Sequence, residues 1–248
     1  MGEIHKYPRT QHLKDFAEGL EGKFVVVEEK MDGSQVGISF DLDGKPLFQS
    51  RGRFLSGPRE RQFDLLKQWT NVHHNELFEI LSNRYIMFGE WMLMKHSIFY
   101  DMLPNYFLEF DVFDKETNTY LGTLERHRMF MGTPVTSVAV LWNGIVDDVS
   151  DIEELIGNSL FKSVDWKSNF VDELKQARII NVDEAFKNTD NSNLMEGLYI
   201  KIEHENQVKN RLKLIRPDFI SNIVENDIHW AENEPIFNRL RPGINMWR

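Results

Sequence analysis

Apolar and polar positions along the chain fall into short runs that predict β-strands joined in hairpins. Residues 24–27 form an apolar, β-branched run. Residues 35–42 and 46–51 flank Asp43-Gly44, a dipeptide typical of tight hairpin turns. A second hairpin is predicted from 195–203 and 207–216 around the polar residues 204–206, and further strands are predicted over 85–92, 107–114 and 134–142.

Helical spacing appears between these strands. Phe63, Leu66 and Trp69 share one face of a segment that begins at Pro58, which predicts a helix over 58–82. Shorter helices are predicted over 124–131, 149–161 and 169–177, and Pro217 suits the start of a final one. Because hairpins and helices are mixed rather than strictly alternating, the pattern favours an α+β fold with antiparallel sheets over a Rossmann-type sheet.

The composition is that of one globular domain. With 248 residues, 41% of them hydrophobic, the chain can bury a sizeable core, which excludes disorder as its main state. Cysteine is absent, so disulfides, thiolate zinc sites and a cysteine nucleophile are excluded. No run approaches the roughly 18 apolar residues of a membrane span, and residues 1–14 lack a signal-peptide core. We therefore expect a cytoplasmic protein that is not associated with a membrane.

The net charge of −10 by itself argues against nucleic-acid binding, because phosphates attract cations. The charges are unevenly distributed, however. Acidic residues are concentrated between 147 and 173, and basic residues between 45 and 67 and between 201 and 216. A basic face on an acidic body is compatible with this distribution.

The sharpest local feature is Lys30-Met31-Asp32-Gly33, which lies between two predicted strands. It is followed in order by Phe88-Gly89-Glu90, residues 107–111, Glu196-Gly197 with Lys201, and Arg211-Leu212-Lys213. A lysine amine can attack phosphorus when it is neutral, and neighbouring cations favour the neutral form by lowering its pKa. This ordered set, which spans about residues 24–216, resembles the covalent nucleotidyltransferase superfamily of ATP-dependent DNA and RNA ligases and mRNA capping enzymes. It looks most like the phage-type and bacterial RNA ligases.

The resemblance implies a nucleotidyltransferase (ATP-grasp-like) fold, in which two antiparallel sheets flanked by helices hold the nucleotide between them. It implies a single adenylation domain over residues 1–248, with an N-terminal arm over 1–20, a short helical extension over 217–248 and no OB-fold domain. The implied activity is an ATP-dependent RNA ligase that seals 5′-phosphate and 3′-hydroxyl ends in RNA repair. Mg²⁺ or Mn²⁺ would assist, the protein would be a monomer, and an end-healing kinase or phosphatase would be a partner.

The resemblance also implies roles for individual residues. Lys30 would attack the α-phosphorus of ATP and carry AMP, while Lys201 and Lys213 would contact the α-phosphate and lower the pKa of Lys30. Glu196 would orient the hydrated metal ion, and Glu90 would accept hydrogen bonds from the ribose.

Phe107 would stack on the adenine, although strand alternation puts Phe107 and Phe110 on opposite faces and leaves the choice between them open. Arg51 would hold the ribose or a nucleic-acid phosphate. Arg211 stands where related RNA ligases usually carry a lysine. The remaining implied nucleotide-binding residues are Glu29, through its backbone, and Asp32 and Gly33, which would shape the loop.

The N-terminal segment Lys6-Tyr7-Pro8-Arg9-Thr10-Gln11-His12-Leu13 resembles a segment of some bacterial and phage RNA ligases. Either Lys6, Arg9 and His12 contact nucleotide phosphates or the RNA end, or the segment is an arm that packs Tyr7 and Leu13 on the domain.

Two alternatives to an RNA ligase remain at this point. The first is a DNA ligase or capping guanylyltransferase, against which the expected lack of an OB-fold counts. The second is a nucleotide- or RNA-binding module without catalysis. The joint presence of Lys30, Glu90, Glu196 and Lys213 counts against the second, because a decayed site has no reason to retain all four.

Overall fold

Eleven strands pair into one sheet in the computed structural model, which describes residues 4–16, 19–57, 60–219 and 235–248. Pairing follows the order β4-β3-β5-β6-β7-β11-β10-β2-β9, with β1 added parallel to β11 and β8 parallel to β6. The strands are β1 (Gln11–His12), β2 (Phe24–Glu29), β3 (Ser34–Phe40), β4 (Pro46–Gln49), β5 (Tyr85–Trp91), β6 (Phe107–Asp114), β7 (Thr119–Leu121), β8 (Thr136–Ser137), β9 (Val140–Ile145), β10 (Gly197–His204) and β11 (Gln207–Ile215).

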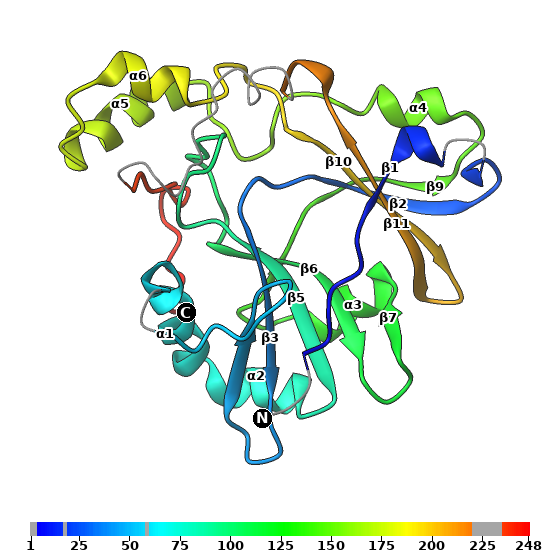
Figure 1. Cartoon of the computed structure of the whole chain (residues 1–248). Helices are drawn as coiled ribbons and strands as arrows, with labels where there is room; N and C mark the ends of the chain where they lie inside the picture. The colour runs from blue at the N-terminus through cyan, green and yellow to red at the C-terminus, as the bar shows by residue number, and fades with distance from the viewer. Residues whose placement is uncertain (1–3, 17–18, 58–59, 220–234) are drawn as a thin grey trace.

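The two sheets implied by the resemblance are, in this structure, two parts of one pairing path. The first part consists of β4, β3, β5 and β6, and the second of β11, β10, β2 and β9. The short strand β7, which the sequence pattern missed, pairs with β6 on one side and with β11 on the other. Figure 1 shows the first part in the lower half of the molecule and the second in the upper half.

Both predicted hairpins are present, and their turns have the expected chemistry. Between β3 and β4, Gly44 adopts a positive φ of 75°, and the Asp41 carboxylate accepts hydrogen bonds from the backbone amides of Asp43 and Lys45 at 3.0 and 2.8 Å. Between β10 and β11, Glu205 and Asn206 adopt φ values of 52° and 56°. Two successive left-handed residues make the tight turn that matches strand twist.

The helices flank this sheet. They are η1 (Leu13–Asp15), η3 (Arg61–Phe63), α1 (Asp64–Val72), α2 (His74–Leu81), α3 (Thr123–Phe130), α4 (Val149–Glu153), α5 (Trp166–Gln176) and α6 (Val182–Lys187). The apolar faces of α1 and α2 pack Leu66, Trp69 and Leu77 against Val36 and Trp91 of the first part of the sheet. Because side chains alternate along β3 and β5, the residues between those that contact the helices point to the opposite face of the sheet.

Several predicted elements differ in length from the observed ones. The helix predicted over 58–82, of which 58–59 lie outside the described residues, is divided at His73, whose buried ring hydrogen-bonds to the Met246 carbonyl. The helix predicted over 149–161 ends at Glu153, and further along the Leu160 amide donates to the Glu29 carboxylate rather than to a helical carbonyl. The strand predicted over 134–142 is two strands, β8 and β9, with different partners.

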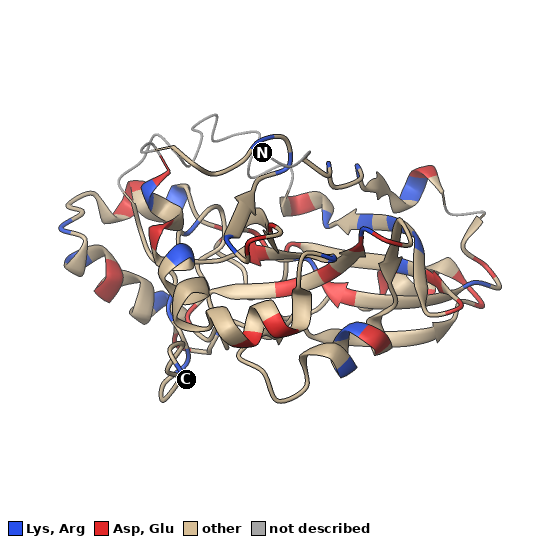
Figure 2. Cartoon of the chain, turned by 90° about the horizontal axis from the view of Figure 1, so that it is seen from below, with Lys and Arg blue, Asp and Glu red and all other residues tan. Residues whose placement is uncertain are grey.

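The helical extension predicted over 217–248 lies partly outside the described residues. Residues 217–219 are helical, whereas the described residues 235–248 form no helix and instead make isolated bridges to the chain after β5. These bridges join Met94 to Phe237 and Leu103 to Leu240. Among the described residues no helix is long and apolar enough to span a membrane. Figure 2 shows acidic and basic positions in all parts of the fold.

Candidate active site

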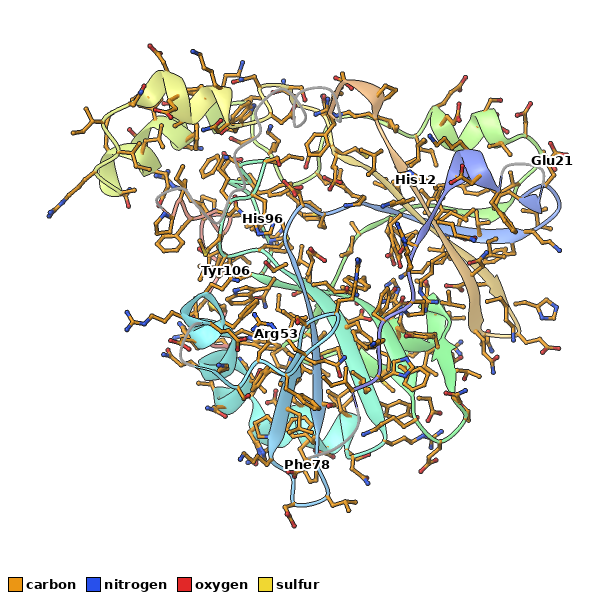
Figure 3. The ribbon with its side chains drawn as sticks, viewed as in Figure 1. His12, Glu21, Arg53, Phe78, His96 and Tyr106 are labelled. Carbon is orange, nitrogen blue, oxygen red and sulfur yellow. The ribbon has the colours of Figure 1, made fainter. Side chains whose placement is uncertain are left out.

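A cavity of about 870 Å³ lies between the two parts of the sheet. That volume is in the range of small-molecule sites, which are roughly 300 to 1,000 Å³. The ends of β2, β5 and β11, the start of β3 and the N-terminal arm all contribute to its wall. Arg53 and His96, labelled in Figure 3, both line it. The predicted site residues that line it are Glu29, Lys30, Gly33, Arg51, Glu90 and Lys213.

Lys30 is placed in this cavity by the strand that precedes it. β2 ends at Glu29, and the Lys30 backbone amide donates to the Gly197 carbonyl at 2.9 Å. Its Nζ lies 2.7 and 2.8 Å from the two carboxylate oxygens of Glu196. Burial would lower the pKa of Lys30, but the carboxylates of Glu196, Glu90 and Asp32 together raise it above its ordinary value. The expected lowering by Lys201 and Lys213 is therefore wrong for the nucleotide-free protein, because carboxylates dominate the surroundings of the amine.

The loop after Lys30 is held by Asp32 and by the absence of a side chain at Gly33. The Asp32 carboxylate accepts hydrogen bonds from the backbone amides of Ser97 and Ile98 at 2.7 and 2.9 Å. A Cβ at Gly33 would lie 2.8 Å from the Trp91 carbonyl oxygen and 2.7 Å from the Met92 sulfur, closer than real contacts allow. Only glycine lets this loop approach β5 so closely.

Three carboxyl groups around the cavity have raised pKa values, in each case chiefly because burial disfavours the charged form. The pKa of Glu90 is raised to about 8, and that of Glu196 to about 7, in both cases against the opposing effect of Lys30. The pKa of Glu29 is raised to about 7, although the Ser159 hydroxyl donates to its carboxylate at 2.6 Å. The site therefore holds groups that exchange protons near neutral pH.

Of the two candidate aromatic residues on β6, Phe110 lines the cavity. Phe107 is fully buried on the opposite face, with its ring centroid 5.7 Å from that of Trp69. The structure does not bring Phe107 to the site, so the assignment of adenine stacking to Phe107 is wrong. Phe110 lies beside Tyr199, with a centroid separation of 5.9 Å, and both rings face the cavity.

Lys201 and Arg211 do not line the cavity either, although both were predicted to bind nucleotide. Lys201 is completely buried; its Nζ donates to the Glu28 carboxylate at 2.8 Å and lies 3.7 Å from Asp111. Nε of Arg211 donates to the same Asp111 at 2.6 Å, and its guanidinium lies 3.8 Å from the centroid of the Tyr120 ring. Both cations therefore neutralise buried carboxylates behind the site.

These residues belong to a buried network of three carboxylates and three cations. Its members are Glu28, Glu109, Asp111, Arg126, Lys201 and Arg211. The pKa of Asp111 is lowered because the facing Arg211, Lys201 and Arg126 outweigh the effect of burial. The network joins β2, β6, β10, β11 and α3, and its Glu28 lies two residues before Lys30 on the cavity wall. The sequence pattern assigned no role to Glu28, Glu109 or Arg126, since charged residues usually lie on the surface.

The N-terminal arm packs on the domain, as one of its two predicted interpretations requires, and it also reaches the cavity. Tyr7 and Leu13 are buried, as an arm packed on the domain requires. Arg9 and Thr10 line the cavity, whereas Lys6 and His12 do not. Among the described residues no group of three His, Asp or Glu side chains is placed to hold a metal ion by itself.

The model of a family described as RNA ligase matches residues 23–215. The Naegleria gruberi RNA ligase with PPi has a TM-score of 0.60 at 20% identity, over 90% of this chain and 58% of that one. Variants of that ligase give 0.58 at 21% identity with ATP and Mn, over 88% and 58%, and 0.59 at 20% with AMP and Mn, over 88% and 57%.

At these identities the similarity to the solved structures shows a shared fold. The present chain spans only 57–58% of the length of the Naegleria gruberi proteins. No sequence among the curated proteins is similar enough to count as a match.

Proposed function

The chain belongs to the RNA ligase family, and on that basis we propose that it is an ATP-dependent RNA ligase that joins a 5′-phosphate to a 3′-hydroxyl. The observation that carries the proposal is a lysine amine, Lys30, held in a cavity of about 870 Å³ with Glu90 and Lys213 on its wall. We propose that the cavity holds ATP between the two parts of the sheet, which is the nucleotidyltransferase arrangement. Solved relatives of the same fold are described with ATP, AMP and Mn.

In the first step Nζ of Lys30 forms a bond to the α-phosphorus, the bond from that phosphorus to the bridging oxygen breaks, and pyrophosphate leaves. The amine must lose a proton before it can attack. Glu196 lies 2.7 Å from Nζ and orients the amine, and a metal ion bound beside this carboxylate would lower the pKa of Lys30. Lys213 and Arg51 on the wall supply positive charge toward the phosphates.

The cavity also contains groups suited to bind the adenine base and a metal ion. The Phe110 ring lines the cavity and can stack on adenine, and Glu90 can accept hydrogen bonds from the ribose. Mg²⁺ in phosphoryl-transfer sites usually binds one or two carboxylates together with substrate phosphates. Glu196 fits that donor set, and the ion when bound would neutralise charge on the triphosphate.

Two further steps complete the reaction. A 5′-phosphate oxygen of RNA attacks the same phosphorus, the bond to Lys30 breaks and the lysine takes up a proton. A 3′-hydroxyl then attacks the 5′-phosphate, loses its proton and expels AMP. We place this sealing in RNA repair inside the cell, by a monomer that acts after a kinase or phosphatase has restored the required ends.

The direct test is incubation with ATP labelled at the α-phosphate, with Mg²⁺, followed by denaturation and detection of label on the protein. The wild type and Lys23→Met, which removes an exposed lysine just before β2, should both retain label. Lys30→Met should lose it completely. Label from GTP in place of ATP would indicate a capping-type enzyme, and no label from either in AMP-free protein would overturn the proposal. Sealing of RNA but not of DNA strands would then exclude a DNA ligase.

A further inference from the structure

The N-terminal arm forms part of the cavity wall, and we propose that its Arg9 binds the 5′-phosphate of the RNA strand. This inference rests on the proposed ligase function and adds a substrate-binding residue to it. Tyr7, Arg9 and Thr10 all line the cavity, although they are separated by about two hundred residues from Lys213 on the same wall. Figure 1 shows the arm, in dark blue, running from the first part of the sheet to the second.

The arm is fixed at both ends. On one side Tyr7 is buried, its hydroxyl hydrogen-bonds to the Asp111 carboxylate and lies 2.6 Å from the Tyr199 hydroxyl, and its ring packs edge-on against Phe88. On the other side β1 pairs with β11, with His12 opposite Lys213, and Leu13 enters the core. Because Arg9 lies between these two anchors, its backbone position is set before any ligand binds, which lowers the entropy cost of binding.

The rim around Arg9 is cationic. Arg51 and Arg53 from the segment after β4 and Lys213 from β11 line the same cavity. Arg53 already pairs with Glu60 at 3.1 Å, and Arg51 donates to a glutamine side chain at 3.4 Å. Within the described part of the chain, the guanidinium of Arg9 makes no hydrogen bond or ion pair. Arg9 is thus an exposed, positioned cation whose charge is available to an anion.

Electrostatic repulsion among these groups supports the same conclusion. Burial lowers the pKa of Lys213, and the positive charges of Lys30, Arg51 and Arg9 lower it further. Cations that repel one another around an open cavity are stabilised by a polyanion entering it. Arginine also presents its donors in a planar fork that matches phosphate oxygens.

The position of Arg9 favours the RNA phosphate over the ATP phosphates. The α-phosphorus of ATP must reach Lys30, whose partner Glu196 is buried deep in the site. Arg9 is exposed at the rim, where the RNA end must pass to reach the adenylate. Arg9 should therefore act after pyrophosphate has left, in the transfer of AMP to RNA.

The test separates the two chemical steps in the full-length chain. Arg9→Ala should form the lysyl adenylate at the wild-type rate within about twofold, because in the proposed arrangement ATP is bound around Lys30 and not at the rim. Single-turnover transfer of AMP from the adenylylated enzyme to 5′-phosphorylated RNA should fall roughly 10- to 100-fold at limiting RNA, as expected for one charge-assisted contact. Lys14→Ala, which removes an exposed charge of the same arm outside the cavity, should change neither step.

Two readouts distinguish phosphate binding from a merely structural role of the arm. The slope of log affinity for RNA against log salt should decrease by about 1 in Arg9→Ala, and Arg9→Lys should restore part of the transfer rate. An equal loss of adenylylation by Arg9→Ala would overturn the proposal and assign Arg9 to ATP. Unchanged transfer and an unchanged salt slope would also overturn it. Absence of adenylylation in the wild type would instead be a failure of the proposed ligase function.

Discussion

Replacing Lys201 by methionine tests whether this lysine stabilises the fold or contacts a phosphate. Lys201 is completely buried and is bonded to the Glu28 carboxylate at 2.8 Å, with Asp111 at 3.7 Å. Methionine has a similar length but carries no charge, so the variant leaves two buried carboxylates with one cation fewer. Breaking a buried ion pair by removing one partner costs about 3–5 kcal/mol.

The remaining contacts of the network set the expected value within that range. Glu28 keeps Arg126 at 2.9 Å and Asp111 keeps Arg211 at 2.6 Å, so neither carboxylate loses all of its partners. We therefore expect a loss of about 3 kcal/mol in the free energy of unfolding, at the lower end of the range.

Urea unfolding followed by tryptophan fluorescence measures this loss. With a slope near 3 kcal/mol/M, at the upper end of the usual range, the midpoint should fall by about 1 M. Lys209→Met is the matched control, since Lys209 is an exposed lysine of the adjacent strand β11; its unfolding free energy should stay within about 0.5 kcal/mol of the wild type. If the unfolding free energy of Lys201→Met were equally close to that of the wild type, the structural role would be refuted. The phosphate contact implied by the resemblance would then be favoured for Lys201.

Four further substitutions test the site. Phe110→Ala should raise the KM for ATP roughly 5- to 150-fold in the adenylylation assay with little change in stability, since stacking on one base is worth about 1–3 kcal/mol. Phe107→Ala should instead lower the unfolding free energy by about 3–5 kcal/mol. The reverse pattern would contradict the placement of the two rings. Glu196→Gln should shift the pH profile of Lys30 acylation, read by peptide mass spectrometry, toward lower pH, because the lost carboxylate stabilised the ammonium form and raised its pKa; an unshifted profile would contradict this. Gly197→Ala should cost about 3 kcal/mol or more in urea unfolding, since its Cβ would meet the backbone of β11; wild-type stability would show that this contact is relieved.

Short-range features of the chain were predictable because local chemistry decides them. Asp43-Gly44 specified a hairpin turn whatever surrounds it, and the run before Lys30 specified a strand that ends at the site. The order of the motifs along the chain identified Lys30, Glu90 and Lys213, and the fold brings them to one cavity. The spacing of 166 residues between Lys30 and Glu196 is closed by pairing of β2 with β10.

The wrong assignments of Lys201 and Arg211 to the nucleotide site concern the position of a residue along its strand. Lys201 lies two residues after Tyr199, so alternation puts them on the same face of β10, but only Tyr199 lines the cavity. The same holds on β11, where Lys213 lines the cavity and Arg211, two residues earlier, meets Asp111 instead. Alternation specifies a face but not the point along the strand at which neighbouring elements cover it.

The sequence by itself determined the α+β class, both hairpins and the motif lysine, because turn chemistry, strand periodicity and motif order are properties of neighbouring residues. Only the tertiary structure decided that Phe110 rather than Phe107 faces the cavity and that Lys201 is buried among carboxylates. It also brought Arg9 of the arm to the same wall as Lys213. Such placements depend on which distant segments pack together, and the energy of a charge depends on the burial that this packing creates.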